Sequence, residues 1–271
     1  MSEDADDLLA EAYERALDHE KAGRIDEAAA AYHEVLALNA DDPGGVSVRL
    51  AAMGRGDAPA KAPAAYVATL FDQHAEVFDG ILVEQLGYAV PMMMRERVQA
   101  LGMGPFARML DLGCGTGLSA EAMEDMAEHI TGVDIAEGMI EIADEKELFH
   151  DLYVAEAEGF LADTPLAPWD LIAATDVLPY LGEAETLLRG AAAHLTLGGV
   201  LIFSTETENA EVLGQRPWVV TPHHRYAHAR AYIETTLAAA GLALREVTDI
   251  IVRHEMGAPI PGHLYVAEKI A

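Results

Sequence analysis

The spacing of apolar residues along the chain changes at residue 108. Before that point, apolar residues recur every three to four positions, which is the period of an amphipathic helix. After it, short aliphatic and β-branched runs alternate with helical stretches. This alternation predicts an α/β domain, in which helices cover both faces of a mostly parallel sheet.

Residues 7–39 carry the helical pattern twice. One apolar stripe runs through Leu8–Lys21 and a second runs through Ile25–Leu38, and Gly23 separates the two. We therefore predict a helical hairpin within residues 1–53.

The hairpin resembles a single tetratricopeptide repeat in the spacing of Ala16, Ala28 and Tyr32, although Ala40 stands where that repeat has proline. A single repeat cannot bury its own apolar face. We expect this face to pack on the rest of the chain, on a second copy of the protein or on a protein partner. A plain helical hairpin with no recognition role is the alternative.

Residues 54–65 are rich in glycine, proline and alanine, which predicts a linker. The second predicted domain spans residues 66–271. It begins with two helices, Ala65–Leu86 and Pro91–Leu101, which are expected to form a lid over residues 66–101.

The rest of the chain reads as alternating strands and helices until its last two strands. The predicted strands are Ala107–Leu112, Ile130–Asp134, Leu152–Ala155, Leu171–Thr175, Val200–Thr205, Leu244–Arg253 and Leu264–Glu268. The predicted helices are Leu118–Glu128, Gly138–Lys146, Glu183–Leu195 and Ala229–Ala240. Since no helix separates the last two strands, we predict a hairpin through Gly257–Gly262. The fold class is α/β, with a Rossmann-like seven-stranded sheet whose last strand is antiparallel.

Composition limits the partners of the protein. The chain has 46 Asp and Glu residues against 17 Lys and Arg residues, a formal net charge of -29. Such a surface repels phosphate backbones and anionic lipid, so we expect no nucleic-acid partner, no membrane contact and a neutral or cationic substrate. The single Cys114 excludes a disulfide framework within the chain. The N-terminus is too acidic for a secretory signal, so we expect a cytoplasmic protein.

The strongest chemical signal is the stretch Met109–Gly117, where a predicted strand ends in a glycine-rich turn. Glycines let the backbone pass close to a ligand, and the helix that follows offers free N–H groups. Gly113, Gly115 and Gly117 form the pattern G-x-G-x-G. A dinucleotide fingerprint needs a further glycine where Leu118 stands, which counts against a nicotinamide-dependent oxidoreductase.

Two acids stand at the ends of neighbouring predicted strands. Asp111 lies two residues before Gly113, where a carboxylate repels a pyrophosphate and favours an ammonium or sulfonium group. Asp134 ends the next strand, where a carboxylate accepts hydrogen bonds from ribose hydroxyls. The two acids predict a pocket for an adenosine-bearing cation with an amino-acid tail.

Over residues 65–270 these motifs resemble the class I S-adenosylmethionine-dependent methyltransferases. The resemblance implies S-adenosyl-L-methionine as cofactor and a small-molecule methyl acceptor. It implies that the glycine loop surrounds the methionine portion and that Asp134 holds the ribose. Further residues that it assigns to the cofactor are Ile135, Met139, Glu156, Ala157 and Thr175.

Together with the N-terminal hairpin, Phe71–Asp79 and Arg225–His228 resemble a bacterial family of predicted methyltransferases with tetratricopeptide repeats. In related enzymes the segment that corresponds to Phe71–Asp79 closes over the methionine end of the cofactor, and a tyrosine there often contacts the cofactor's carboxylate. His74 is the residue of this segment that could replace the tyrosine.

Three residues are candidates for a general base. His224 and His228 are four positions apart and are expected to share a helical face, and Asp176 follows the fourth predicted strand. No Glu-x-x-His motif or cysteine accompanies the histidines, so no metal is assigned. The residues expected to contact the substrate are Tyr180, Arg225 and Tyr226.

Two other functions remain open at this point. The α/β domain could bind the cofactor without turnover while the helical hairpin recruits a protein. The second alternative is the nicotinamide-dependent oxidoreductase, which requires the glycine loop to hold a pyrophosphate.

Overall fold

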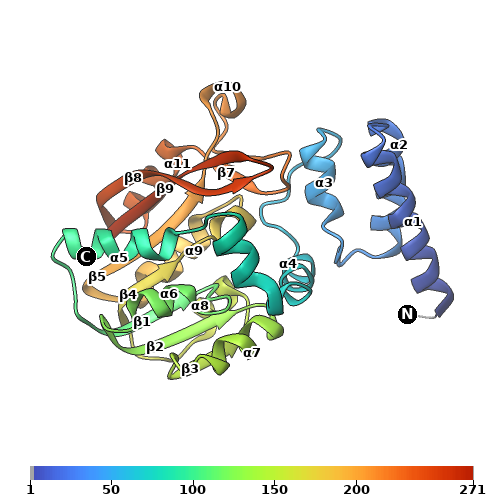
Figure 1. Cartoon of the computed structure of the whole chain (residues 1–271). Helices are drawn as coiled ribbons and strands as arrows, with labels where there is room; N and C mark the ends of the chain where they lie inside the picture. The colour runs from blue at the N-terminus through green and yellow to red at the C-terminus, as the bar shows by residue number, and fades with distance from the viewer. Residues whose placement is uncertain (1–2, 271) are drawn as a thin grey trace.

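The computed structural model describes residues 3–270, and its centre is a mixed β-sheet (Figure 1). Its long strands lie in the order β3-β2-β1-β4-β5-β9-β8. The strands from β3 to β5 are parallel, and β9 is antiparallel to both of its neighbours, which confirms the predicted sheet. The strands are β1 (Phe106–Leu112), β2 (Ala127–Asp134), β3 (Asp151–Val154), β4 (Trp169–Ala174), β5 (Leu195–Glu206), β6 (Trp218–Val220), β7 (Tyr226–His228), β8 (Leu242–Glu255) and β9 (Ala258–Lys269).

Helices cover both faces of the sheet. Because side chains alternate between faces along a strand, Met109 of β1 lies in a core with α5 and α6, whereas Leu110 lies in a core with α8, α9 and α11. The α-helices are α1 (Glu3–Lys21), α2 (Ile25–Leu38), α3 (Val46–Ala52), α4 (Ala64–Asp72), α5 (Val90–Ala100), α6 (Leu118–Met123), α7 (Glu137–Glu145), α8 (Ala157–Asp163), α9 (Glu185–His194), α10 (Ala210–Leu213) and α11 (Arg230–Ala239). The short helices are η1 (Ala75–Val77), η2 (Gly80–Gln85) and η3 (Leu178–Tyr180). None of the helices within residues 3–270 is long and apolar enough to cross a membrane.

The N-terminal helices form a hairpin beside the α/β domain (Figure 1). Helices α1 and α2 confirm the two predicted helices, and Tyr32 is fully buried between them. Helix α3, which follows the turn that ends α2, was not among the predicted elements. Val46 and Leu50 of α3 lie in the same core as the hairpin, so α3 covers apolar surface that a lone repeat would expose. The similarity to a tetratricopeptide repeat stays a prediction.

The predicted linker at residues 54–65 is partly fixed in place. Ala62 is buried, and its N–H donates to the carbonyl oxygen of Tyr180 at 2.9 Å. A composition that favours flexibility is overridden here by backbone hydrogen bonds to the α/β domain.

The lid is more broken than predicted. The single helix expected over Ala65–Leu86 is wrong, because the chain forms α4, then η1 and then η2. At the end of α4, Asp72 Oδ1 accepts the N–H of Gly138 at 2.8 Å. This bond ties the end of α4 to the start of α7, so the lid follows the α/β domain instead of continuing as one rod.

The last two strands pair along almost their whole length, from Leu242 with Lys269 to Glu255 with Ala258. The predicted wide turn through residues 257–262 is wrong, because only residues 256 and 257 lie between the strands. Gly262 is part of β9 itself. A Cβ atom at Gly262 would lie 2.2 Å from the carbonyl oxygen of Thr205, so this glycine permits close pairing with β5 instead of a turn.

A hairpin of β6 and β7 extends the end of β5, where Glu206 pairs with Ala227. The helical interpretation of the segment with His224 and His228 is therefore wrong. His228 lies in β7, and His224 lies in the preceding turn with a φ of 59°, which is left-handed and incompatible with a right-handed helix.

Candidate functional site

A cavity opens at the carboxyl ends of the parallel strands. Strand β1 lies between β2 and β4, which is the switch point where open α/β sheets bind ligands. The cavity and the open space at its mouth together amount to about 1010 Å³. Its residues from β1 onward are Gly113, Cys114, Gly115, Thr116, Leu118, Ser119, Asp134, Ile135, Ala155, Glu156, Ala157, Thr175, Asp176, Val177, Tyr180 and Leu181. Its residues from before β1 are Lys61, Ala62, Ala64, Val67, Phe71, Phe78, Leu82, Tyr88 and Pro91.

The glycine loop forms one wall of this cavity. Gly113, Gly115 and Gly117 have φ values of 64°, 53° and 94°. Residues with a Cβ atom rarely adopt such positive values. A Cβ atom at Gly113 would lie 2.5 Å from Val177 Cγ2. Gly113 and Gly115 line the cavity, whereas Gly117 lies behind it against Phe149.

Asp134, the last residue of β2, lies next to the glycine loop. Its Oδ2 accepts the N–H of Gly115 at 2.9 Å, and its Oδ1 accepts the N–H of Ala136 at 2.9 Å. Burial raises the pKa of Asp134, while the backbone N–H groups act in the opposite direction. Asp134 lines the cavity and is fixed by the loop that it faces.

Asp111 differs from Asp134 in its hydrogen-bond partners and in its position relative to the cavity. It is fully buried, neither of its oxygens has a hydrogen-bond partner, and it lies outside the cavity-lining residues. Burial, and then the charge of Asp134, raises the pKa of Asp111 to about 8. Below that pH Asp111 is protonated and uncharged, so the expectation that both acids hold a cation is wrong, and only Asp134 is placed to contact a positively charged ligand.

Glu156 lines the cavity at the end of β3. Its Oε2 accepts the N–H of Gly159 and so caps α8, a helix that the sequence analysis did not predict. Its Oε1 lies 3.3 Å from Lys61 Nζ. Ile135 and Ala157 line the cavity beside it.

Two predicted cofactor residues lie away from the cavity lining. Met139 is fully buried in a small core with Ala75 and Ala136. His74 is exposed, and its ring Nδ1 lies 2.8 Å from the carbonyl oxygen of Leu70. The aromatic side chain that the Phe71–Asp79 segment adds to the cavity besides Phe71 is that of Phe78.

Thr175, Asp176 and Tyr180 line the opposite end, after β4. Thr175 Oγ1 lies 2.8 Å from Ser119 Oγ. Asp176 has a φ of 60°, and its N–H donates to Ser204 Oγ at 2.9 Å. The Tyr180 hydroxyl and Asp176 Oδ1 are buried without a hydrogen-bond partner, so this end holds two polar atoms that a ligand could satisfy.

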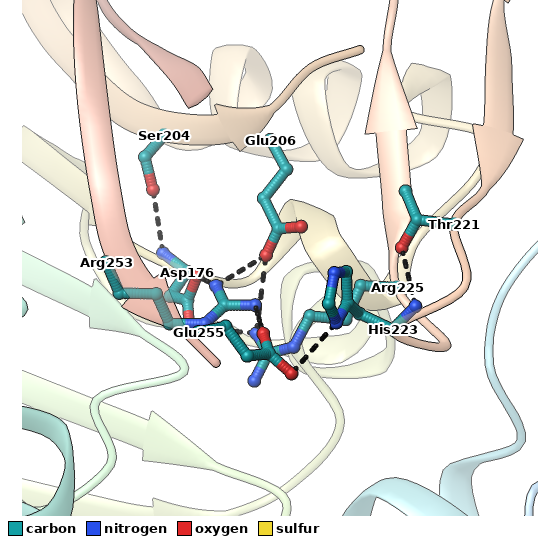
Figure 2. Close-up of polar contacts among 8 residues, drawn as sticks. All are labelled: Asp176, Ser204, Glu206, Thr221, His223, Arg225, Arg253 and Glu255. Carbon is teal, nitrogen blue, oxygen red and sulfur yellow. Dashed lines mark hydrogen bonds and ion pairs between the residues drawn. The ribbon is translucent and has the colours of Figure 1, made fainter. Parts of the chain in front are cut away.

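A buried ion-pair cluster lies next to Asp176 (Figure 2). Arg225 Nη1 donates to Asp176 Oδ2 at 3.2 Å and lies 3.6 Å from Glu206 Oε1. Arg253 Nη1 donates to the same oxygen of Glu206 at 2.6 Å, and its Nη2 donates to Glu255 at 3.0 Å. The guanidinium of Arg225 also lies 5.0 Å from the centre of the Tyr180 ring. Arg225 therefore supports both cavity residues from behind, although it lies outside the cavity lining.

The two histidines predicted as bases do not reach the cavity. His228 is fully buried, its Nε2 lies 3.2 Å from the carbonyl oxygen of Gly182, and burial lowers its pKa to about 4. His224 Nε2 instead lies 3.6 Å from Glu20 of α1. Tyr226 is also fully buried outside the lining. Asp176 is the one of the three predicted bases that lines the cavity.

Several lining residues from the lid and the linker were not among the predicted site residues. Tyr88 lies in the short gap between the two predicted lid helices, and Lys61 lies in the predicted linker. The sequence does not mark these residues, because they line the cavity only once the lid and the linker have folded onto the α/β domain. No group of three or more His, Cys, Asp or Glu residues that could hold a metal ion occurs within residues 3–270.

Comparison with known sequences gives the family of this chain. A family described as a methyltransferase domain matches residues 66–247. The ubiquinone biosynthesis O-methyltransferase of Idiomarina loihiensis is 30% identical over 180 residues, which are 60% of this chain and 70% of that protein. The enzyme of the same name from Maricaulis maris is 31% identical over 160 residues, which are 53% of this chain and 63% of that protein.

Solved structures show the same fold. An S-adenosylmethionine-dependent methyltransferase from Clostridium acetobutylicum aligns with a TM-score of 0.54 and 17% identity, over 74% of this chain and all of that one. The N-methyltransferase NodS from Bradyrhizobium japonicum, in complex with S-adenosyl-L-homocysteine, aligns with a TM-score of 0.51 and 19% identity, over 66% of this chain and 85% of that one. The family match supports a methyltransferase. It does not support the two alternatives, a nicotinamide-dependent oxidoreductase and a cofactor-binding module without turnover. The chain thus belongs to the class I S-adenosylmethionine-dependent methyltransferases.

Proposed function

We propose that this methyltransferase transfers the methyl group to a hydroxyl oxygen of a small, uncharged acceptor with an apolar body. The lining of the cavity carries the proposal. The end near β4 and the lid is aromatic and aliphatic, and Asp176 is its charged residue. The apolar residues at this end are Val67, Phe71, Phe78, Leu82, Tyr88, Pro91, Val177 and Tyr180. The O-methyltransferase activity in the names of the two relatives supports oxygen as the methylated atom.

The opposite end has the features that the cofactor requires. Gly113 and Gly115 permit close approach of the backbone, and Asp134 lines the cavity with a carboxylate that two N–H groups already fix. Ile135 and Glu156 complete this end. S-adenosylmethionine, when bound, supplies a methyl group on a positively charged sulfur. The protein then has to orient the acceptor and exclude water.

Asp176 is the residue we assign to the acceptor hydroxyl. Its Oδ2 is engaged by Arg225, whereas its Oδ1 has no hydrogen-bond partner and lies 4.0 Å from Arg253 Nη1. A hydroxyl that donates to Asp176 Oδ1 and accepts from the Tyr180 hydroxyl would satisfy both buried atoms. A hydrogen bond of this kind to a carboxylate increases the nucleophilicity of the oxygen.

The proposal is tested by incubating the protein with methyl-labelled S-adenosylmethionine and a panel of phenols, alcohols, amines and carboxylates. We expect methyl ethers from uncharged hydroxyl compounds. Asp176→Asn should lower kcat by about 100-fold or more, the usual contribution of a positioned base. Its affinity for S-adenosyl-L-homocysteine should stay within about twofold of the wild-type value, because Asp176 is assigned to the acceptor.

Asp249→Asn is the control, because the side chain of Asp249 is 85% exposed. This variant should behave like the wild type. Methylation on nitrogen alone, or full activity of Asp176→Asn, would contradict the proposal.

A further inference from the structure

The four residues 59–62, which we call the strap, cross from the N-terminal helices to the edge of the cavity. They precede the region that the family match covers. The carbonyl oxygen of Ala60 accepts the N–H groups of Gly182 and Glu183 at 2.8 and 2.9 Å. Lys61 also forms an isolated antiparallel bridge with Leu181. The strap is therefore held like an added strand on the segment that follows η3.

Side chains fix the strap on both sides of this ladder. The hydroxyl of Tyr226 donates to the carbonyl oxygen of Pro59 at 3.0 Å. Ala62 lies in one buried cluster with Tyr180, Tyr226 and Val48 of α3. The strap thus lies between the N-terminal helices and the wall of the cavity, and Lys61 and Ala62 line the cavity themselves.

Lys61 connects the strap to the β3 end of the cavity. Its Nζ lies 3.3 Å from Glu156 Oε1 and 2.8 Å from Glu158 Oε2. Glu156 lines the cavity, while Glu158 does not. Without the ammonium group, the two carboxylates would repel each other in a chain whose net charge is already -29, and Glu156 would lose the partner that fixes its Oε1.

We propose that the strap is part of the cofactor site, and that Lys61 is a positioning residue that holds Glu156 in place at the cavity. It follows that cofactor binding and docking of the strap stabilise each other, because a coupling between two sites acts equally in both directions. The N-terminal helices are then linked to cofactor affinity through the strap. This inference goes beyond the proposed acceptor chemistry and does not depend on it.

The experiment measures binding of S-adenosyl-L-homocysteine by calorimetry and its dissociation by stopped-flow. Lys61→Met keeps the apolar stem and removes the charge. We expect about threefold weaker binding and faster dissociation, as the loss of partly exposed ion pairs predicts. Lys61→Arg should restore wild-type binding within about twofold, since it keeps the charge. If the weaker binding of Lys61→Met came only from altered packing, Lys61→Arg, which also changes the shape of the side chain, should bind more weakly as well.

Lys269→Met is the matched control, because Lys269 donates to the carbonyl oxygen of Leu195 at the other end of β5, away from the cavity. It should bind as the wild type does. Hydrogen exchange on the unmodified protein provides a test that needs no variant. S-adenosyl-L-homocysteine should slow exchange at the amides of Ala62 and Gly182. Unchanged binding by Lys61→Met, or unchanged exchange in the strap when the ligand protects the glycine loop, would overturn the proposal.

Discussion

At the scale of single residues, two neighbouring acids show how environment separates the roles of identical side chains. Asp134 accepts two backbone N–H groups and faces the cavity, so its charge is compensated and available. Asp111 is buried one strand away with no partner for either oxygen. A carboxyl group in this position is costly to ionise unless a positive charge lies nearby.

The burial of Asp111 predicts a pH dependence of stability. The pKa of Asp111 is about 8 in the folded protein, far above the ~3.9 of an unperturbed aspartate. Between these values the folded state binds more protons than the unfolded state, so the stabilising contribution present below about pH 4 is lost as the pH rises toward 8. In Asp111→Asn this proton is absent, and the decline should be smaller.

The measurement is the free energy of unfolding in urea at pH 5 and at pH 8 for both proteins. The wild type should lose stability relative to Asp111→Asn by on the order of 1 kcal/mol per pH unit. Asp249→Asn, which changes an exposed acid, should follow the wild type. Parallel pH curves for the wild type and Asp111→Asn would show that Asp111 is ionised throughout this range.

At the scale of elements, the sequence predicted those parts of the fold whose pattern is local. The strand that ends at Leu112 and the glycine turn after it are visible in the sequence because period and turn chemistry agree. The course of the lid and the β6–β7 hairpin depend on distant contacts. Examples are the hydrogen bond between Asp72 and Gly138 and the strand pairing of Glu206 with Ala227. No local sequence pattern encodes either contact. The same reason explains why Asp134 was found at the cavity and His228 was misplaced.

The glycine loop predicts different outcomes for two alanine substitutions. Gly113 and Gly198 both have a left-handed φ, of 64° and 80°, and each would incur strain of about 1–2 kcal/mol with a Cβ atom. At Gly113 the new Cβ atom would also lie 2.5 Å from Val177, whereas nothing lies within 4 Å at Gly198. Gly113→Ala should therefore cost about 1–3 kcal/mol more.

Thermal unfolding and calorimetry with S-adenosyl-L-homocysteine distinguish these outcomes. Gly198→Ala should have a lower Tm and unchanged affinity, because Gly198 lies in β5 at the irregularity between the pairs Trp169–Leu195 and Leu171–Val200, outside the cavity lining. Gly113→Ala should lower both the Tm and the affinity, since Val177 lines the cavity and has to move. Equal effects of the two substitutions would mean that the loop accommodates a side chain without moving Val177.

At the scale of the whole molecule, the N-terminal helices and the α/β domain share buried surface. Val48 of α3 lies in the cluster that contains Ala62, Tyr180 and Tyr226, and Glu20 of α1 lies within 3.6 Å of His224. The same N-terminal helices also have their own core, to which Val35 of α2 belongs. A substitution in the shared cluster should therefore affect ligand binding as well as stability, whereas one in the core of the N-terminal helices should affect stability alone.

Val48→Ala and Val35→Ala remove the same two methyl groups from buried positions that are 0% and 5% exposed. Each should destabilise the protein by about 1–3 kcal/mol through lost burial and the cavity that remains. Val48→Ala should also weaken the binding of S-adenosyl-L-homocysteine, because it loosens the packing of Ala62 beside the cavity. Val35→Ala should leave that affinity unchanged, since its neighbours belong to the N-terminal helices alone. Calorimetry on both variants checks this difference, and equal affinities for the two would show that the N-terminal helices are attached to the domain without influencing its site.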